Sequence, residues 1–133
     1  MIKVMVGMGC DRNVSLQTLE IALSQALQRA NLKPDSIAGL ASIDKKNDEI
    51  ALLELARKNG WQLHFFTAEE LAKVPVPNPS EVVRKYMGTP AVAEAAALLA
   101  AKTQMQNLLI EKHKYLGDDG KNATVSIAKI ESI

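Results

Sequence analysis

The chain has 133 residues, 47% of them hydrophobic and 23% charged, which is ordinary for one globular domain. Its 16 basic and 15 acidic residues leave a net charge of +1, and aromatic residues make up only 4%. A nucleic-acid-binding protein would show a basic excess or an aromatic stacking surface, and a membrane protein an apolar run of about 20 residues. The sequence has none of these features, so we expect no nucleic-acid partner and no membrane contact.

The start of the chain and its cysteine content indicate a cellular compartment. Residues 1–4 lack the apolar stretch of a signal peptide, and Cys10 has no second cysteine with which to form an internal disulfide. We therefore expect a cytoplasmic protein. No repeat, low-complexity tract or linker interrupts the sequence, so we interpret residues 1–133 as a single domain.

The first half of the chain alternates apolar strands with helices. Ile2–Met8 predicts a strand buried on both faces, and Ser15 caps the helix that follows. Ile37–Ile43 predicts a second strand, Asp48 caps a second helix, and Leu63–Phe66 predicts a third strand. This alternation is typical of a parallel sheet with right-handed crossovers.

The second half begins with a capping box at residues 67–70, followed by prolines at 75, 77 and 79 that exclude a helix there. Ser80 can cap a further helix, and an alanine-rich helix covers residues 91–101. Leu108–Tyr115 and Ala123–Ile130 predict an antiparallel hairpin, with one solvated face because Thr124 and Ser126 alternate with apolar residues. The expected fold class is therefore α/β: a three-layer domain whose mainly parallel sheet carries the C-terminal hairpin at its edge.

The loop after the first strand is a candidate ligand site, because ligands of open α/β sheets bind beyond the carboxyl ends of strands. Gly7 and Gly9 would let a ligand approach the backbone, although a tight turn without a ligand explains them equally. Cys10 is either reactive or a small buried residue, and Arg12 either binds a carboxylate or is a solvated surface residue. Since Arg12 replaces the third glycine of a dinucleotide fingerprint, we expect no NAD or FAD cofactor.

The segment after the second strand, residues 42–49, lies at the same edge of the predicted sheet. Asp44 or Glu49 could act as a general base, and Lys46 could bind an acid group or stabilise an oxyanion. The alternative is a charged loop with an aspartate cap. These three residues are the candidate catalytic group.

Two further segments could wall a pocket. The prolines of residues 74–80 stiffen an extended loop that includes Pro77 and Asn78, and Gly88 and Thr89 precede another helix start. A rigid connector and a simple helix cap are the corresponding structural alternatives. The two histidines have no partner at metal-ligand spacing, so no metal site is expected.

Five segments in this order resemble the C-terminal domain of CbiG and its stand-alone relative CobE, and the resemblance covers nearly the whole chain. They are Gly7–Cys10, Ser42–Glu49, Phe65–Leu71, Val74–Ser80 and Gly88–Ala96. The resemblance implies an α/β fold and a role in cobalamin biosynthesis. CbiG is the cobalt-precorrin 5A hydrolase, which opens a δ-lactone on the macrocycle and releases acetaldehyde.

The resemblance further implies that the ligand is a corrinoid intermediate, a flat ring bearing acetate and propionate groups. Such a ligand would need separated cations beside an apolar wall. Full-length CbiG carries further domains ahead of this one, so hydrolysis could depend on residues outside this chain. The family often places a basic residue directly after the loop cysteine, where this sequence has Asp11. The alternative function is a non-catalytic interaction module for other enzymes of the corrin pathway.

Overall fold

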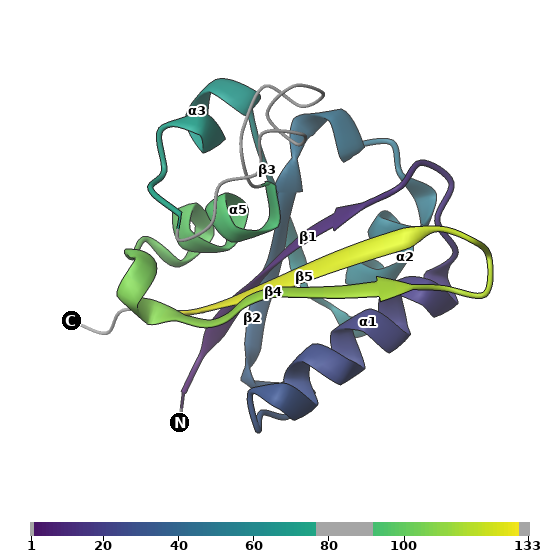
Figure 1. The fold of residues 1–133 in the computed structure, drawn as a ribbon, viewed down its shortest axis with the longest axis horizontal. Helices are drawn as coiled ribbons and strands as arrows, with labels where there is room; N and C mark the ends of the chain where they lie inside the picture. Colours follow the sequence, from purple (N-terminus) through teal and green to yellow (C-terminus); the bar gives the residue numbers. More distant parts are fainter. Residues whose placement is uncertain (1, 77–91, 131–133) are drawn as a thin grey trace.

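The computed structural model describes residues 2–76 and 92–130. It is built on a five-stranded sheet with the strand order β3-β2-β1-β5-β4 (Figure 1). The strands are β1 Val4–Cys10, β2 Ile37–Ile43, β3 Gln62–Phe66, β4 Leu108–Leu116 and β5 Asn122–Lys129. The helices are α1 Leu16–Arg29, α2 Ile50–Asn59, α3 Ala68–Ala72 and α5 Val92–Ala101. The helix expected after Ser80 and the candidate residues Pro77, Asn78, Gly88 and Thr89 lie outside the described residues.

The sheet has a parallel side and an antiparallel side. β1 pairs in parallel with β2, and β2 with β3, whereas β5 pairs antiparallel with both β1 and β4. The predicted α/β fold with a C-terminal hairpin at the sheet edge is thus confirmed. Only β4 lies at the edge, because β5 is inserted between β4 and the parallel strands.

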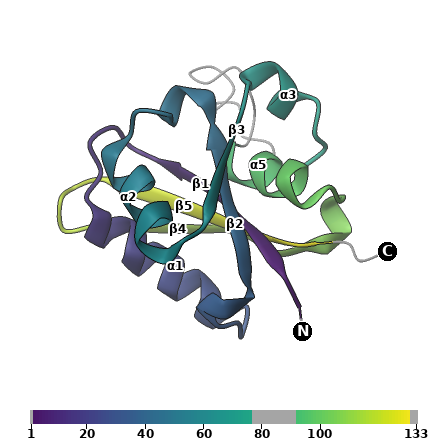
Figure 2. The ribbon, with the colours of Figure 1, turned by 180° about the vertical axis from the view of Figure 1, so that it is seen from behind.

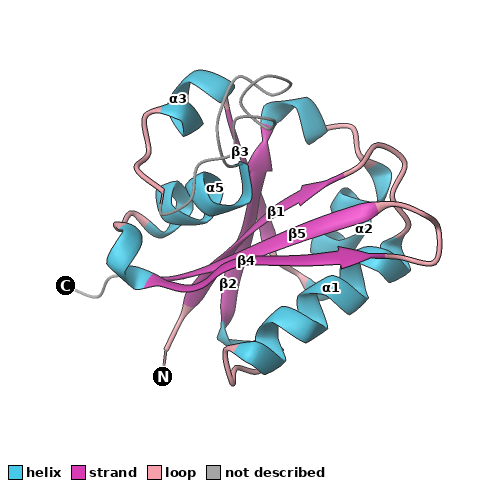
Figure 3. Cartoon of the chain, in the orientation of Figure 1, coloured by secondary structure: helices cyan, strands magenta, loops and turns pink. Residues whose placement is uncertain are grey.

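Helices cover both faces of this sheet, as Figures 1 and 3 show. On one face α1 and α2 pack against the side chains of Val4, Val6 and Met8, and Figure 2 views this layer from behind. On the other face α5 and α3 pack against Met5 and the end of β2. Alternate residues of β1 therefore serve two separate cores, which explains its uninterrupted apolar sequence. Within residues 2–76 and 92–130, no helix is long and apolar enough to cross a membrane.

Local capping signals place most of the helix ends. The Ser15 hydroxyl accepts a hydrogen bond from the backbone N–H of Thr18 at 3.1 Å, and Thr67 forms the predicted capping box with Glu70. The predicted cap of α2 is wrong. Glu49, not Asp48, occupies the N-cap position, and it makes no side-chain capping bond. The Asp48 carboxylate instead forms an ion pair with Arg12, which competes with helix capping for the same oxygens.

Gly7 is the point at which α5 rests on the sheet. A methyl group at Gly7 would overlap with the carbonyl oxygen of Ala93 and lie 2.8 Å from the backbone nitrogen of Ala97.

Opposite Gly7 on β5 is Ser126, which is fully buried and donates a hydrogen bond to the Glu111 carbonyl at 2.7 Å. The prediction of a solvated face on β5 is therefore wrong, because β5 is an interior strand covered on both sides.

The tip of the β4–β5 hairpin is attached to the start of α1. Asp119 accepts hydrogen bonds from the Ser15 backbone N–H at 2.8 Å, the Thr18 hydroxyl at 2.9 Å and the Lys121 backbone N–H at 3.0 Å. These donors favour the ionised carboxylate and lower the pKa of Asp119 to about 2. The contact joins residues more than 100 positions apart in the chain.

Candidate functional site

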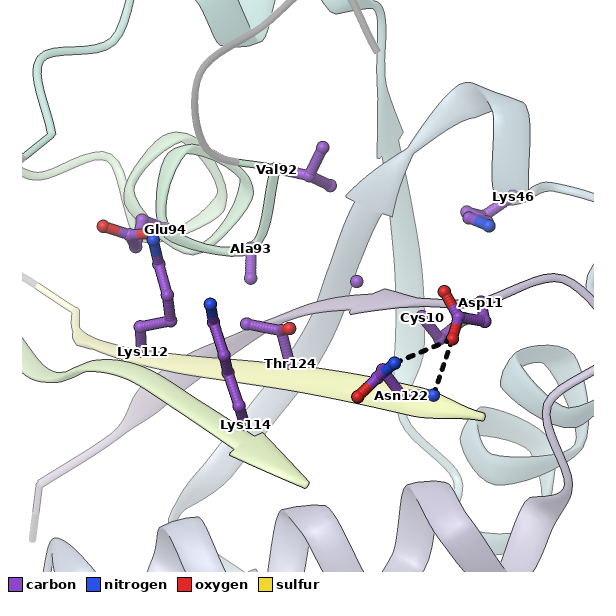
Figure 4. A pocket seen from close by; sticks show the side chains of 11 residues that line it. Cys10, Asp11, Lys46, Val92, Ala93, Glu94, Lys112, Lys114, Asn122 and Thr124 are labelled. Atoms are coloured by element: carbon purple, nitrogen blue, oxygen red, sulfur yellow. Dashed lines mark hydrogen bonds and ion pairs between the residues drawn. The ribbon is translucent and has the colours of Figure 1, made fainter. Parts of the chain in front are cut away.

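A pocket of about 190 Å³ lies at the carboxyl ends of β1 and β2, beside the first turn of α5 (Figure 4). Gly9, Cys10 and Asp11 line it from the end of β1, and Lys46 from the 3-10 turn after β2. This is the edge at which ligands of open α/β sheets bind. Gly9 leaves room on this wall, since the nearest described atom to a methyl group there would be the Thr124 Cβ, at 4.0 Å.

Lys46 is the most unusual residue of the pocket. Only 6% of its surface is exposed, although it is a lysine. Among the described residues it forms no ion pair with a carboxylate. A lysine that lines a pocket, is largely buried and has no ion pair among the described residues is suited to bind an anionic ligand.

Lys112 and Lys114 of β4 supply two more cations to the pocket. Figure 4 shows them rising from β4, with Lys46 on the far side beyond Cys10 and Asp11. Their direction depends on irregularities in β4. The pairing register shifts between Ile110 and His113, so that Ile110 and His113 both face α1 while the two lysines face the pocket.

Glu94, on the first turn of α5, is the buried carboxylate of the pocket. Its surface is 1% exposed, and its Oε1 lies 3.3 Å from the Lys112 ammonium. Its Oε2 is buried without a hydrogen-bond partner among the described residues. Burial raises the pKa of Glu94, and the nearby Lys112 opposes that shift.

Asp11 and Cys10 complete the wall at the end of β1. The Asp11 carboxylate accepts hydrogen bonds from the backbone N–H and side-chain amide of Asn122, at 2.8 and 3.1 Å (Figure 4). Burial raises the pKa of Cys10 to about 11, against the opposing effect of Lys46. The thiol is therefore neutral near pH 7 and is a poor nucleophile.

Arg12 belongs to a second cluster that does not line this pocket. Its guanidinium donates hydrogen bonds to the Asp48 carboxylate and the Lys45 carbonyl, both at 2.7 Å, and lies 3.2 Å from Glu49 Oε2. The other oxygen of Glu49 accepts a hydrogen bond from the Asn13 backbone N–H at 2.9 Å. The hydrogen bond from Arg12 also lowers the pKa of Asp48. This cluster ties the loop after β1 to the start of α2.

The structure therefore separates residues that the sequence grouped together. Gly9, Cys10 and Lys46 share the pocket, whereas Arg12 and Glu49 line a neighbouring cavity. Asp44 begins the 3-10 turn and lines neither cavity, so the candidate catalytic group of Asp44, Lys46 and Glu49 does not converge on one point. Gly7 lies beneath α5, which accounts for its lack of a side chain.

The sequence analysis did not single out three charged residues that line the pocket: Lys112, Lys114 and Glu94. Each had a weak signal. The lysines flank His113 in a strand predicted at the sheet edge, and Glu94 is the only charged residue of α5. Among the described residues, no three His, Cys, Asp or Glu side chains come together as a metal site.

Comparison with known proteins relates this geometry to a family. The family model described as Cobalamin synthesis G C-terminus matches residues 4–128. Cobalt-precorrin-5A hydrolase of Priestia megaterium is 33% identical over 125 residues, which are 94% of this chain and 32% of that protein. Protein CobE of Sinorhizobium sp is 32% identical over 100 residues, which are 74% of this chain and 65% of that protein.

The solved structures agree with this assignment. The crystal structure of CobE, a protein from the cobalamin (vitamin B12) biosynthetic pathway, superimposes with a TM-score of 0.83 at 29% identity, covering 99% of this chain and 93% of that one. The chain spans about a third of the length of the Priestia megaterium hydrolase. It belongs to the Cobalamin synthesis G C-terminus family, a family of cobalamin biosynthesis.

Proposed function

We propose that this domain binds a corrinoid intermediate of cobalamin biosynthesis in the pocket between Lys46 and β4. The observation that carries the proposal is Lys46, a largely buried lysine that lines the pocket and has no ion-pair partner among the described residues. The two β4 lysines add positive charge on the opposite wall. Such an arrangement supports recognition of an anionic ligand with more than one acid group.

A corrinoid intermediate has the matching chemistry, because acetate and propionate groups surround its flat apolar ring. A cavity of about 190 Å³ is smaller than a typical ligand pocket of 300–1,000 Å³. We therefore propose that the described pocket receives one edge of the macrocycle, with its carboxylates, rather than the whole ring. The name of one relative, cobalt-precorrin-5A hydrolase, and the cobalamin biosynthetic pathway of CobE support the choice of this ligand class.

Binding is a better-supported role than hydrolysis for the chain itself. Lactone opening requires a base that activates water and a donor that stabilises the oxyanion. Glu49 is engaged by Asn13 and Arg12, away from Lys46. The chain also spans only a third of the hydrolase that it resembles. We propose that the domain presents the intermediate and that the hydrolytic step requires additional groups.

The test is an anaerobic titration of the chain with the lactone intermediate, following the visible absorbance of the ring and the release of acetaldehyde. Spectral binding without acetaldehyde is the expected result. Acetaldehyde release by the chain alone would overturn the division of roles, and absence of binding would overturn the proposed function.

The matched variants are Lys46→Met and Lys45→Met, since the two lysines are adjacent but only Lys46 is buried in the pocket. Loss of a buried charge partner should weaken binding by at least about tenfold in the Lys46 variant. The Lys45 variant should bind as the parent does. Equal affinities for the two variants would contradict the role of Lys46.

A further inference from the structure

The Glu94–Lys112 pair has an imbalance that bears on ligand binding. Glu94 is 1% exposed, and Lys112 is the only cation that lies within ion-pair distance of it among the described residues. Oε1 faces Lys112 at 3.3 Å, and Oε2 has no hydrogen-bond partner there. One ammonium thus compensates an entire buried carboxylate.

Lys112 is also the cation that a ligand can reach. Its side chain is 23% exposed, it lines the pocket, and Lys114 lines the same wall. An entering carboxylate would compete with Glu94 for the Lys112 ammonium. Two carboxylates sharing one ammonium repel each other, and the buried one cannot regain hydration. Protonation of Glu94 removes that conflict.

We propose that a carboxylate of the ligand binds Lys112 and that Glu94 takes up one proton from solvent in the same step. The inference rests on the proposed function, because it assumes an anionic ligand in this pocket. The charges balance in this exchange: the ligand carboxylate replaces Glu94 as the partner of Lys112, and a proton from solvent neutralises the Glu94 carboxylate. No covalent bond to the ligand is formed.

The surroundings of Glu94 favour this proton uptake. Burial is the largest cause and raises the pKa of Glu94; from β4, Lys112 and Lys114 lower that pKa and Glu111 raises it, and the net shift is upward. Within residues 2–76 and 92–130, the other titratable groups of the pocket wall are Cys10, Asp11 and Lys46. β5 contributes the uncharged Asn122 and Thr124, and α3 packs on α5 through the apolar Leu71, with Glu69, Glu70 and Lys73 at its exposed surface. When a ligand occupies Lys112, the largest opposing influence on the Glu94 pKa is reduced.

The direction of the pH dependence follows from linkage. Because the bound state holds one more proton than the free state, affinity must increase as pH falls. The increase is at most about tenfold per pH unit, in the window between the pKa of Glu94 in the free protein and its higher pKa in the complex.

Calorimetric titration of the whole chain tests the proposal. The probe is cobyrinic acid, a cobalt corrin whose side chains end in free carboxylates, at pH 6, 7 and 8 in two buffers of different ionisation enthalpy. The difference in heat between the buffers counts the protons taken up. Cobinamide, whose side chains are amides, is the comparison ligand; without carboxylates it should bind more weakly than cobyrinic acid and without proton uptake.

The central variant is Glu94→Gln, a neutral side chain of the same shape as the protonated residue. It should bind more tightly than the parent at pH 8, with an affinity that changes less than about twofold between pH 6 and pH 8. Lys112→Met should also abolish proton uptake, but it should weaken binding. Glu54→Gln, on α2 and outside this pocket, is the matched control and should behave as the parent.

The outcomes separate this inference from the proposed function. Absence of cobyrinic acid binding to the parent at every pH would overturn both. Binding without net proton uptake, or uptake that persists in Glu94→Gln, would overturn the inference alone and leave Glu94–Lys112 as an ion pair that joins α5 to β4. Because a purely structural pair would not change the proton count, this readout is decisive even if the variants lower stability.

Discussion

Two charged clusters lie at the carboxyl ends of β1 and β2, and they differ in whether the cation has an ion-pair partner. In one, Arg12 faces Asp48 and Glu49, so that the cation and both carboxylates have partners. In the other, Lys46 is buried in the pocket without an ion-pair partner among the described residues. The first cluster joins the loop after β1 to the start of α2. In the second, we propose that the Lys46 ammonium binds a ligand carboxylate.

The largest expected effect comes from Gly7, which supports the wall shared by the pocket and α5. Gly7→Ala should lower the free energy of unfolding by about 3 kcal/mol, because its methyl group would collide with the backbone of Ala93 and Ala97. Gly9→Ala is the control, since its methyl group points into free space beside Thr124. It should leave stability within about 0.5 kcal/mol of the parent while narrowing the pocket. Urea denaturation of both variants checks this, and equal stabilities would disprove the close contact.

The reactivity of Cys10 tests whether its thiol is neutral in the pocket. With a pKa of about 11, the thiol is almost entirely neutral at pH 8. Its alkylation by iodoacetamide at that pH should be roughly a hundredfold slower than that of a small free thiol. Stopped samples analysed by mass spectrometry give the rate, with the urea-unfolded chain as the fully reactive reference. A rapid reaction of the folded chain would instead mark Cys10 as an activated thiolate.

Substitution of Glu49 in one cluster and of Lys46 in the other disrupts each cluster separately. Glu49→Gln should lower the free energy of unfolding by about 1–2 kcal/mol, because the buried carboxylate that contacts Arg12 and Asn13 is lost. The affinity for the corrinoid should be unchanged. Lys46→Met should instead lose at least about tenfold in affinity without loss of stability, since the buried ammonium is removed. Thermal unfolding and absorbance titration measure the two properties. If both variants lost both properties equally, the clusters would be one site.

The smallest expected effect concerns Asp119, a hydrogen-bonded carboxylate at the tip of the β4–β5 hairpin, which does not line the pocket. Its folded-state pKa of about 2 lies below its ordinary value of 3.8, so its stabilisation is complete above about pH 5 and is lost as pH falls through about 2. Asp119→Asn should therefore be less stable than the parent at pH 7, and the difference should shrink below pH 4. Urea midpoints across this range provide the measurement. Asp118→Asn, on the same exposed turn, should show no such trend.

Much of the fold could be predicted because its signals are local. Apolar runs identified β1 and β2, Ser15 and Thr67 identified helix starts, and the order of elements predicted the parallel strands. The errors arose where distant residues compete. Asp48 does not cap α2 because Arg12, 36 positions away, takes its carboxylate. Ser126 is buried because α5 packs on the face of the sheet that Ser126 shares with Gly7.

The site divides in the same way. Strand ends are visible in a sequence, so Gly9, Cys10 and Lys46 could be named in advance as neighbours at one edge of the sheet. Lys112 and Lys114 could not, because a register shift in β4 decides which face they occupy. Glu94 looked like one polar residue of an alanine-rich helix, and its burial depends on how α5 rests on Gly7.

By itself, then, the sequence determined the elements, their order, the family resemblance and the edge of the sheet where a ligand would bind. Those features depend on periodicity, capping and strand ends, which act within a few residues. Only the tertiary structure decided that Arg12 is paired with Asp48 and Glu49, and that Glu94 shares Lys112 with the pocket. It also left Lys46 without an ion pair in the part of the chain that the structure describes. Coulomb energies depend on distances of a few ångströms and on local hydration, and the packing of β4, β5 and α5 sets both.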